Sequence, residues 1–191
     1  MKKFLTLKNI LVCAGALFGI LVFALSFADG MKGVIDGVDG KIPNIVWGST
    51  KIIGSFGGHV ETVPFYDGFG VASSGILALP FIGVLLALLS AIGACVVLFV
   101  VKDAKVQKIA LLVCGGLLLL GGVFQFFAGA MFPGHVANKM IANGVIPENN
   151  RELVLRMFAD MHANAAVYLT GVFGVLGGAA IAVSQLLPEK K

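Results

Sequence analysis

The chain has 191 residues, of which 58% are hydrophobic and only 13% are charged. So few charged side chains cannot solvate the surface of a water-soluble domain, and the composition therefore excludes an ordinary soluble enzyme. The net charge of +4 is too small and too scattered for a nucleic-acid-binding protein, so no nucleic acid is expected among the partners.

Four uncharged runs separate the charged segments: residues 9–28, 68–101, 109–134 and 163–188. Each run is long enough, at about 1.5 Å per residue, to cross a hydrocarbon core of roughly 30 Å. We therefore predict an all-α membrane protein, a bundle of four transmembrane helices in which residues 1–191 form a single integral membrane domain. The expected spans are about 9–28, 70–101, 109–132 and 163–187, joined by outer loops at 29–69 and 133–162.

The first run has a second interpretation. A basic start followed by an apolar stretch and the small residues Ser26 and Ala28 is also typical of a cleaved signal peptide, which would leave three spans. The uncharged run is longer than the roughly 7–15 residues of a signal core, and this length favours a membrane span.

The first outer loop has the pattern of a small antiparallel sheet. Short β-compatible pieces at 41–47, 51–56 and 59–65 are separated by turn residues rich in glycine. The loop has no cysteine, so such a sheet must rest on the helix ends or on a neighbouring chain. Trp47 is interpreted as an anchor at the membrane interface, as a plug between the sheet and the bundle, or as a contact for a partner. The expected partner contacts are Trp47, Phe65, Tyr66 and Phe69.

Small residues recur every four positions along three of the spans, on one face of each helix. In lipid, helices associate where small side chains let their backbones approach closely. We therefore predict helix-packing contacts at Gly15, Gly19, Gly83, Ala87, Ala91, Gly174, Gly178 and Ala182. Pro80 falls early in the second span, where it is expected to kink the helix.

The last span is expected to begin before the membrane. Pro147 and Asn150 can start a helix at about Arg151, and Leu153, Met157 and Met161 repeat every four residues. This pattern predicts one helix over 151–187, whose first turns would stand above the bilayer. The alternative is an interfacial helix that lies flat and breaks near Ala163.

The basic residues predict the orientation. The two termini and the short loop between the second and third spans carry Lys2, Lys3, Lys8, Lys102, Lys105, Lys108, Lys190 and Lys191, whereas the two long loops carry more acidic than basic residues. By the positive-inside rule, both termini are cytoplasmic and the long loops face outward. We expect a multi-pass protein of the plasma membrane.

The chain offers no pattern of catalytic residues, so no enzymatic activity and no cofactor are expected. The spans lack the interior ionisable residues typical of ion-coupled transporters, and Gln125 and Gln185 are expected to bond between helices. The best candidate metal ligands are His135, His162 and His59, although interfacial histidines that cap helix ends are the favoured explanation. The alternative functions are therefore a cofactor- or metal-carrying subunit of a membrane enzyme, or a small transporter or channel.

The layout resembles the claudins and the related peripheral myelin proteins. A short cytoplasmic start, a first outer loop larger than the second and a very short loop between spans two and three are similar to that family, and Ile45-Val46-Trp47 stands where the family has a glycine-leucine-tryptophan step. The two cysteines that follow this step in the family are absent. The resemblance implies a structural, non-enzymatic role in assembly, as a homo-oligomer or with other membrane proteins, through the outer loops.

Overall fold

The computed structural model describes residues 6–35, 38–43, 51–56, 59–64, 78–142, 144, 147–160 and 162–188. The chain forms two compact units. The first, called here the bundle unit, contains Met1–Ala24, Ile82–Gln125 and Leu169–Lys191. The second, called here the sheet unit, contains Leu25–Phe81 and Phe126–Tyr168.

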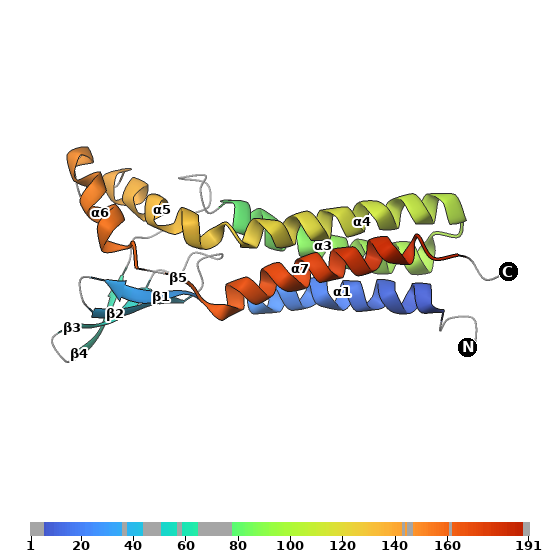
Figure 1. The fold of residues 1–191 in the computed structure, drawn as a ribbon, viewed down its shortest axis with the longest axis horizontal. Coiled ribbons are helices and arrows are strands. Elements are labelled where there is room, and N and C mark those ends of the chain that lie inside the picture. Colours follow the sequence, from blue (N-terminus) through green and yellow to red (C-terminus); the bar gives the residue numbers. More distant parts are fainter. Residues whose placement is uncertain are drawn as a thin grey trace. The chain divides into compact units, whose positions relative to one another are not determined.

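Four helices are long and apolar enough to cross a membrane, which confirms the prediction of a mostly helical, multi-pass membrane protein (Figure 1). They are α1 (Leu7–Leu25), α3 (Ala78–Val100), α4 (Ala104–Gln125) and α7 (Ala165–Ser184). Their outward side chains are large and apolar: Leu89, for example, is 65% exposed and Leu17 is 57% exposed. Such a surface is stable in lipid and not in water.

Polar residues immediately before three of these helices fix where they start. Thr6 accepts a hydrogen bond from the Asn9 amide through its Oγ1 atom (3.3 Å), and Asp103 accepts one from the Val106 amide through Oδ1 (2.9 Å). The Asn164 side chain accepts from the Ala165 amide (2.8 Å) at the start of α7. Each contact satisfies a backbone donor that the first helical turn leaves without a partner.

The connection between α3 and α4 is only three residues long and is closed by one side chain. The Nε2 atom of Gln107, in the first turn of α4, donates to the carbonyl oxygens of Val97, Leu98 and Val101 at distances of 3.3–3.4 Å. The carbonyls of Val97 and Leu98 lie in the last turn of α3, and Val101 follows the helix. The Val97 carbonyl also accepts from the Val101 amide (3.2 Å). The amide of Gln107 therefore binds the end of one span to the start of the next.

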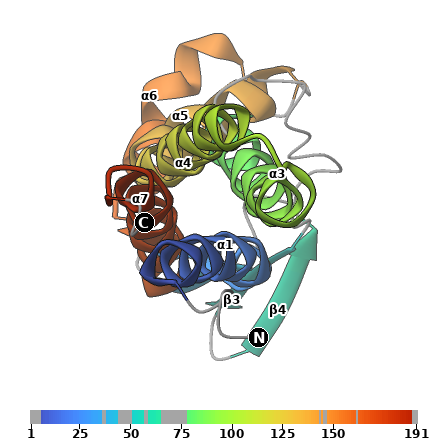
Figure 2. The same cartoon turned by 90° about the vertical axis from the view of Figure 1, so that its right-hand side faces the viewer.

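Within the bundle unit the helices form a closed ring in the order α1, α3, α4, α7, and α7 returns beside α1 (Figure 2). Fully buried apolar side chains come from all four helices and include Val12, Val84, Leu111, Leu118 and Ile181. The rings of Phe18 (α1) and Phe173 (α7) stack with their centroids 5.4 Å apart. The interior of the ring is thus filled by side chains.

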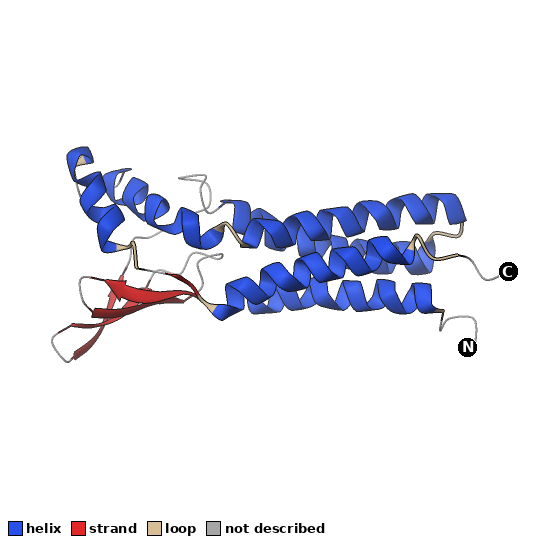
Figure 3. Cartoon of the chain, viewed as in Figure 1, coloured by secondary structure: helices blue, strands red, loops and turns tan. Residues whose placement is uncertain are grey.

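The sheet unit contains one antiparallel sheet with the strand order β4-β3-β2-β1-β5 (Figure 3). Its strands are β1 (Asp29–Ile35), β2 (Val38–Pro43), β3 (Lys51–Phe56), β4 (His59–Pro64) and β5 (His162–Ala163). A small sheet was predicted, but β1 and β5 were not among the expected pieces. The two-residue strand β5 pairs Ala163 with Met31, so it attaches the segment before α7 to the strand that follows α1.

Helices of the sheet unit add a small core. They are α5 (Ala128–Ala142), the 3₁₀ turn η1 (Glu148–Asn150) and α6 (Arg151–Met157). The rings of Phe132 (α5) and Phe158, just after α6, meet edge to face with centroids 6.1 Å apart. Phe132 and Met31 are both completely buried. An aromatic pair of this geometry contributes about 0.5–1.5 kcal/mol beyond the area that it buries.

The prediction of one continuous helix over 151–187 is wrong. The helix α6 ends at Met157, the chain then turns, and β5 intervenes before α7 begins at Ala165. The backbone N–H of Asn164 donates to the carbonyl of Gly30 (2.9 Å), which fixes the break against β1. The apolar repeat every four residues is real, but backbone pairing with β1 outweighs the helical preference of this segment.

Two further expectations about the helices differ from the structure. Pro80 is the third residue of α3, where proline removes no helical hydrogen bond, so the expected kink has no cause. The third span was expected over 109–132, whereas α4 ends at Gln125 and α5 begins at Ala128. The uncharged run therefore contains the end of one helix and the start of another.

Candidate functional site

The predicted packing residues lie along the seams between neighbouring helices of the ring. At the α1–α7 seam, a Cβ atom placed on Gly15 would lie 2.6 Å from the carbonyl oxygen of Gly177. At the α1–α3 seam, a Cβ on Gly19 would lie 2.8 Å from the Cβ of Ala91 and 2.9 Å from the carbonyl oxygen of Ala87. Backbones approach this closely only where side chains are absent or are single methyl groups.

The other two seams are equally close. At the α3–α4 seam, a Cβ on Gly83 would lie 2.5 Å from the carbonyl oxygen of Gly121. At the α4–α7 seam, a Cβ on Gly178 would lie 2.5 Å from the Gly115 carbonyl, and one on Gly174 the same distance from the Cα of Gly122. The backbone of Ala182 lies on this seam as well, 3.1 Å from the position of a Cβ on Gly115. The structure therefore brings every predicted packing residue to a seam inside one chain.

Three of the seam glycines are on α4, and they were not among the predicted packing residues. Gly115, Gly121 and Gly122 each face backbone atoms of a neighbouring helix, whereas a Cβ on Gly116 would meet no atom of the described chain within 4 Å. The glycines of α4 do not repeat every four residues, so no single face is evident in the sequence. Gly121 faces α3, whereas Gly115 and Gly122 face α7.

The polar side chains buried in the bundle unit are few and uncharged. They include Ser90, Gln125, Thr170, Ser184 and Gln185. Gln125 lies at the α3–α4 seam, where its Nε2 atom would be 2.5 Å from a Cβ on Gly83. The Nε2 atom of Gln185 donates to Ser184 of its own helix (2.5 Å), rather than across helices as expected.

These buried groups do not form a catalytic arrangement in the described part of the bundle unit. Ser184 donates to the Ile181 carbonyl (2.6 Å), so its hydroxyl hydrogen is used within α7. Among the described residues, Ser90 Oγ and Gln185 Oε1 are buried without a hydrogen-bond partner. A hydroxyl and an amide oxygen without a neighbouring base or charge can bind a donor but cannot activate a nucleophile.

The three candidate metal ligands lie in different surroundings. His135 is completely buried on α5, whereas His162 is exposed on β5. His59 is the first residue of β4, and its side chain lies outside the described part of the structure. Among the described residues, no group of three or more His, Cys, Asp or Glu side chains is close enough to hold a metal ion.

The predicted partner contacts Trp47, Phe65, Tyr66 and Phe69 lie outside the described residues. What the structure does describe nearby is the edge of the sheet. The strand β4 is paired with β3 from His59 to Pro64, and within the described sheet it has a neighbour on one side only. The opposite edge of the sheet is the two-residue strand β5.

Sequence reasoning missed two features of this region. Phe132 and Phe158 form the aromatic pair of the sheet unit, and Lys32 lies opposite both Lys41 of β2 and His162 of β5. The sequence shows that positions 132 and 158 are both aromatic, but not that the two rings meet. The register that makes Lys32 a neighbour of His162 was not, because β5 has only two residues and lies far along the chain.

Comparison with known proteins adds no assignment: no protein-family model and no curated protein sequence matches this chain.

Proposed function

We propose that this protein is a non-enzymatic, multi-pass protein of the cell membrane that assembles with a second copy of itself through the segment between its first two spans. The observation that carries the proposal is the edge strand β4, which among the described strands pairs with β3 alone. An edge strand presents a row of backbone N–H and C=O groups, and such a row pairs readily with a strand of another chain.

The bundle unit supports the same proposal, because its packing faces are occupied within one chain. The small-residue faces predicted from the sequence lie at seams within the chain, as at Gly15 with Gly177 and at Gly83 with Gly121. The apolar side chains that remain outside the ring are suited to lipid. Specific recognition of a partner is therefore assigned to the sheet unit rather than to the spans.

The proposal includes the orientation of the chain in the membrane. Within the bundle unit, the start of α1, the α3–α4 turn and the end of α7 are at the same end (Figure 1). The basic residues Lys8, Lys102, Lys105 and Lys108 are therefore gathered at that end. The positive-inside rule assigns this end to the cytoplasm and the loop that contains β1 to β4 to the outside.

Proline substitutions test the edge. Backbone N–H groups alternate along a strand between its two neighbours, and a proline in an edge strand lies where its missing N–H would face away from the sheet. Thr62 is two residues before Pro64, so its N–H faces the open edge. We expect Thr62→Pro to abolish the crosslinked dimer of the full-length protein in membranes while β3 and β4 stay paired.

Val63→Pro is the matched control, because the N–H of Val63 faces β3. This variant should lose protection from hydrogen exchange in β3, whereas Thr62→Pro should keep it. A dimer that survives in Thr62→Pro, or a parent protein that crosslinks only to other membrane proteins, would contradict assembly through this edge.

A further inference from the structure

A row of basic positions crosses three neighbouring strands of the sheet. Lys32 on β1 lies opposite Lys41 on β2 and opposite His162 on β5. Like charges directly opposite each other destabilise a sheet. The side chains of Lys32 and His162 are exposed, and neither makes a hydrogen bond or ion pair with a described residue. The side chains of Lys32 and His162 are therefore open to an anion.

The length of the chain keeps this row close to the membrane. His162 is three residues before Ala165, where the candidate span α7 begins, so even a fully extended chain separates them by only about 10 Å. Lys32 is one strand spacing further, roughly 4.8 Å. The polar headgroup layer extends about 5–7 Å beyond the hydrocarbon core, and a lysine side chain can reach into it from above.

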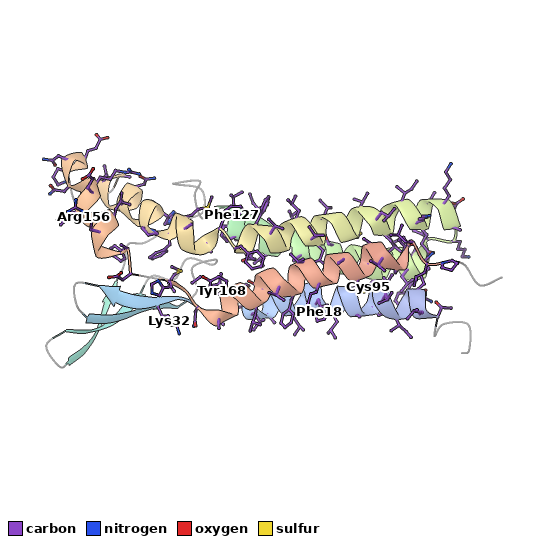
Figure 4. The ribbon with its side chains drawn as sticks, viewed as in Figure 1. Phe18, Lys32, Cys95, Phe127, Arg156 and Tyr168 are labelled. Carbon is purple, nitrogen blue, oxygen red and sulfur yellow. The ribbon has the colours of Figure 1, made fainter. Side chains whose placement is uncertain are left out.

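Exposed aromatic side chains of the sheet unit lie close along the chain to the ends of the candidate spans. Tyr168, in the first turn of α7, is 49% exposed, and Phe27, just after α1, is 53% exposed. Phe126 and Phe127, just after α4, are 44% and 46% exposed. Aromatic residues gather where a span meets the headgroups. Figure 4 shows Tyr168 and Lys32 close to the junction between α7 and the sheet.

We propose that Lys32, with His162 beside it, binds the phosphate of an anionic phospholipid headgroup at the membrane surface next to α7. The inference is independent of the β4 edge, which lies at the other side of the sheet. The row lies opposite the buried face of β1, since Met31, the neighbour of Lys32, is completely buried. The exposed carboxylate of Asp160 lies two positions before His162 and lowers the positive potential there.

The test is a lipid titration of the full-length protein in mild detergent, followed by native mass spectrometry. The probes are phosphatidylglycerol, phosphatidylcholine with the same acyl chains, and inorganic phosphate. We expect the parent to bind phosphatidylglycerol more tightly than phosphatidylcholine, and Lys32→Gln to weaken the phosphatidylglycerol affinity by roughly fivefold. Asp160→Asn should strengthen it, because it removes a neighbouring negative charge.

Arg156→Gln is the matched control, since Arg156 is an exposed cation of the same unit on α6, away from the row (Figure 4). It should bind phosphatidylglycerol as the parent does. Without lipid, Lys32→Gln should melt at the same or a higher temperature than the parent, which separates lost binding from lost folding. Equal affinities of the parent for the two lipids, an unchanged Lys32→Gln, or displacement by millimolar inorganic phosphate would overturn the proposal.

Discussion

Replacement of Gly122 by alanine measures how close the α4 and α7 backbones are. The added Cβ would lie 2.6 Å from the Val175 nitrogen and 2.8 Å from both the Gly171 oxygen and the Gly174 carbonyl carbon. All three are backbone atoms, which cannot rotate away as a side chain would. The two helices must therefore separate, and overpacking of this kind costs about 1–3 kcal/mol.

Gly116→Ala is the internal standard for this measurement, because it is on the same helix and its Cβ would meet no described atom within 4 Å. Both variants exchange glycine for alanine inside a helix, which by itself stabilises by about 0.5–1 kcal/mol. Since this helical gain is common to the two, their difference in unfolding free energy isolates the seam. We expect Gly122→Ala to be the less stable of the two by about 1–3 kcal/mol.

The assay is denaturant unfolding of the purified protein in mild detergent, followed by circular dichroism. Gly116→Ala should unfold at the same or a higher denaturant concentration than the parent, and Gly122→Ala at a lower one. Equal stability of the two variants would refute the reasoning, because it would show that the α4–α7 seam has room for a methyl group.

Three further predictions concern other contacts. Asp103→Ala removes the side chain that caps α4 and should lower the unfolding free energy by about 0.5–2 kcal/mol, with faster amide exchange at Val106; unchanged exchange there would contradict this cap. Phe132→Ala empties a buried position in the sheet unit and should cost about 3–5 kcal/mol, read as lost exchange protection in β1, whereas Phe127→Ala at an exposed position should have no such effect. Lys105→Cys should react with a membrane-impermeant maleimide only after the cells are permeabilised, and labelling of intact cells would reverse the proposed orientation.

The four spans were predictable because a long, continuous apolar segment is enough to indicate a membrane-spanning helix. The uncharged run at 109–134 illustrates the limit, since a hydropathy pattern cannot show that the helix ends at Gln125 and that a second one starts at Ala128. The packing faces were readable where small residues repeat every four positions, as at Gly174 and Gly178. On α4 the glycines serve two different neighbours, and this division depends on the three-dimensional ring.

The segment before α7 was mispredicted for a different reason. Its local pattern, with Leu153 and Met157 four residues apart, favours a helix, but the chain is redirected by pairing between β5 and β1. Contacts between residues 31–32 and 162–163 join distant parts of the sequence, and no local propensity reports them. The basic row depends on the same long-range register and was therefore also invisible in the sequence.

The Gln107 contact has a consequence for how the protein enters the membrane. The α3–α4 hairpin needs only its own residues to form: the amide of Gln107 joins the two helices at one end, and Gly83 meets Gly121 towards the other. It can therefore insert as a finished pair while later parts of the chain are still on the ribosome. The seam of α1 with α7 depends on Gly15 finding Gly177, so the ring stays open until the last span arrives. Until then Gly15 of α1 has no partner helix to pack against, although Gly19 can already meet Ala91 of α3.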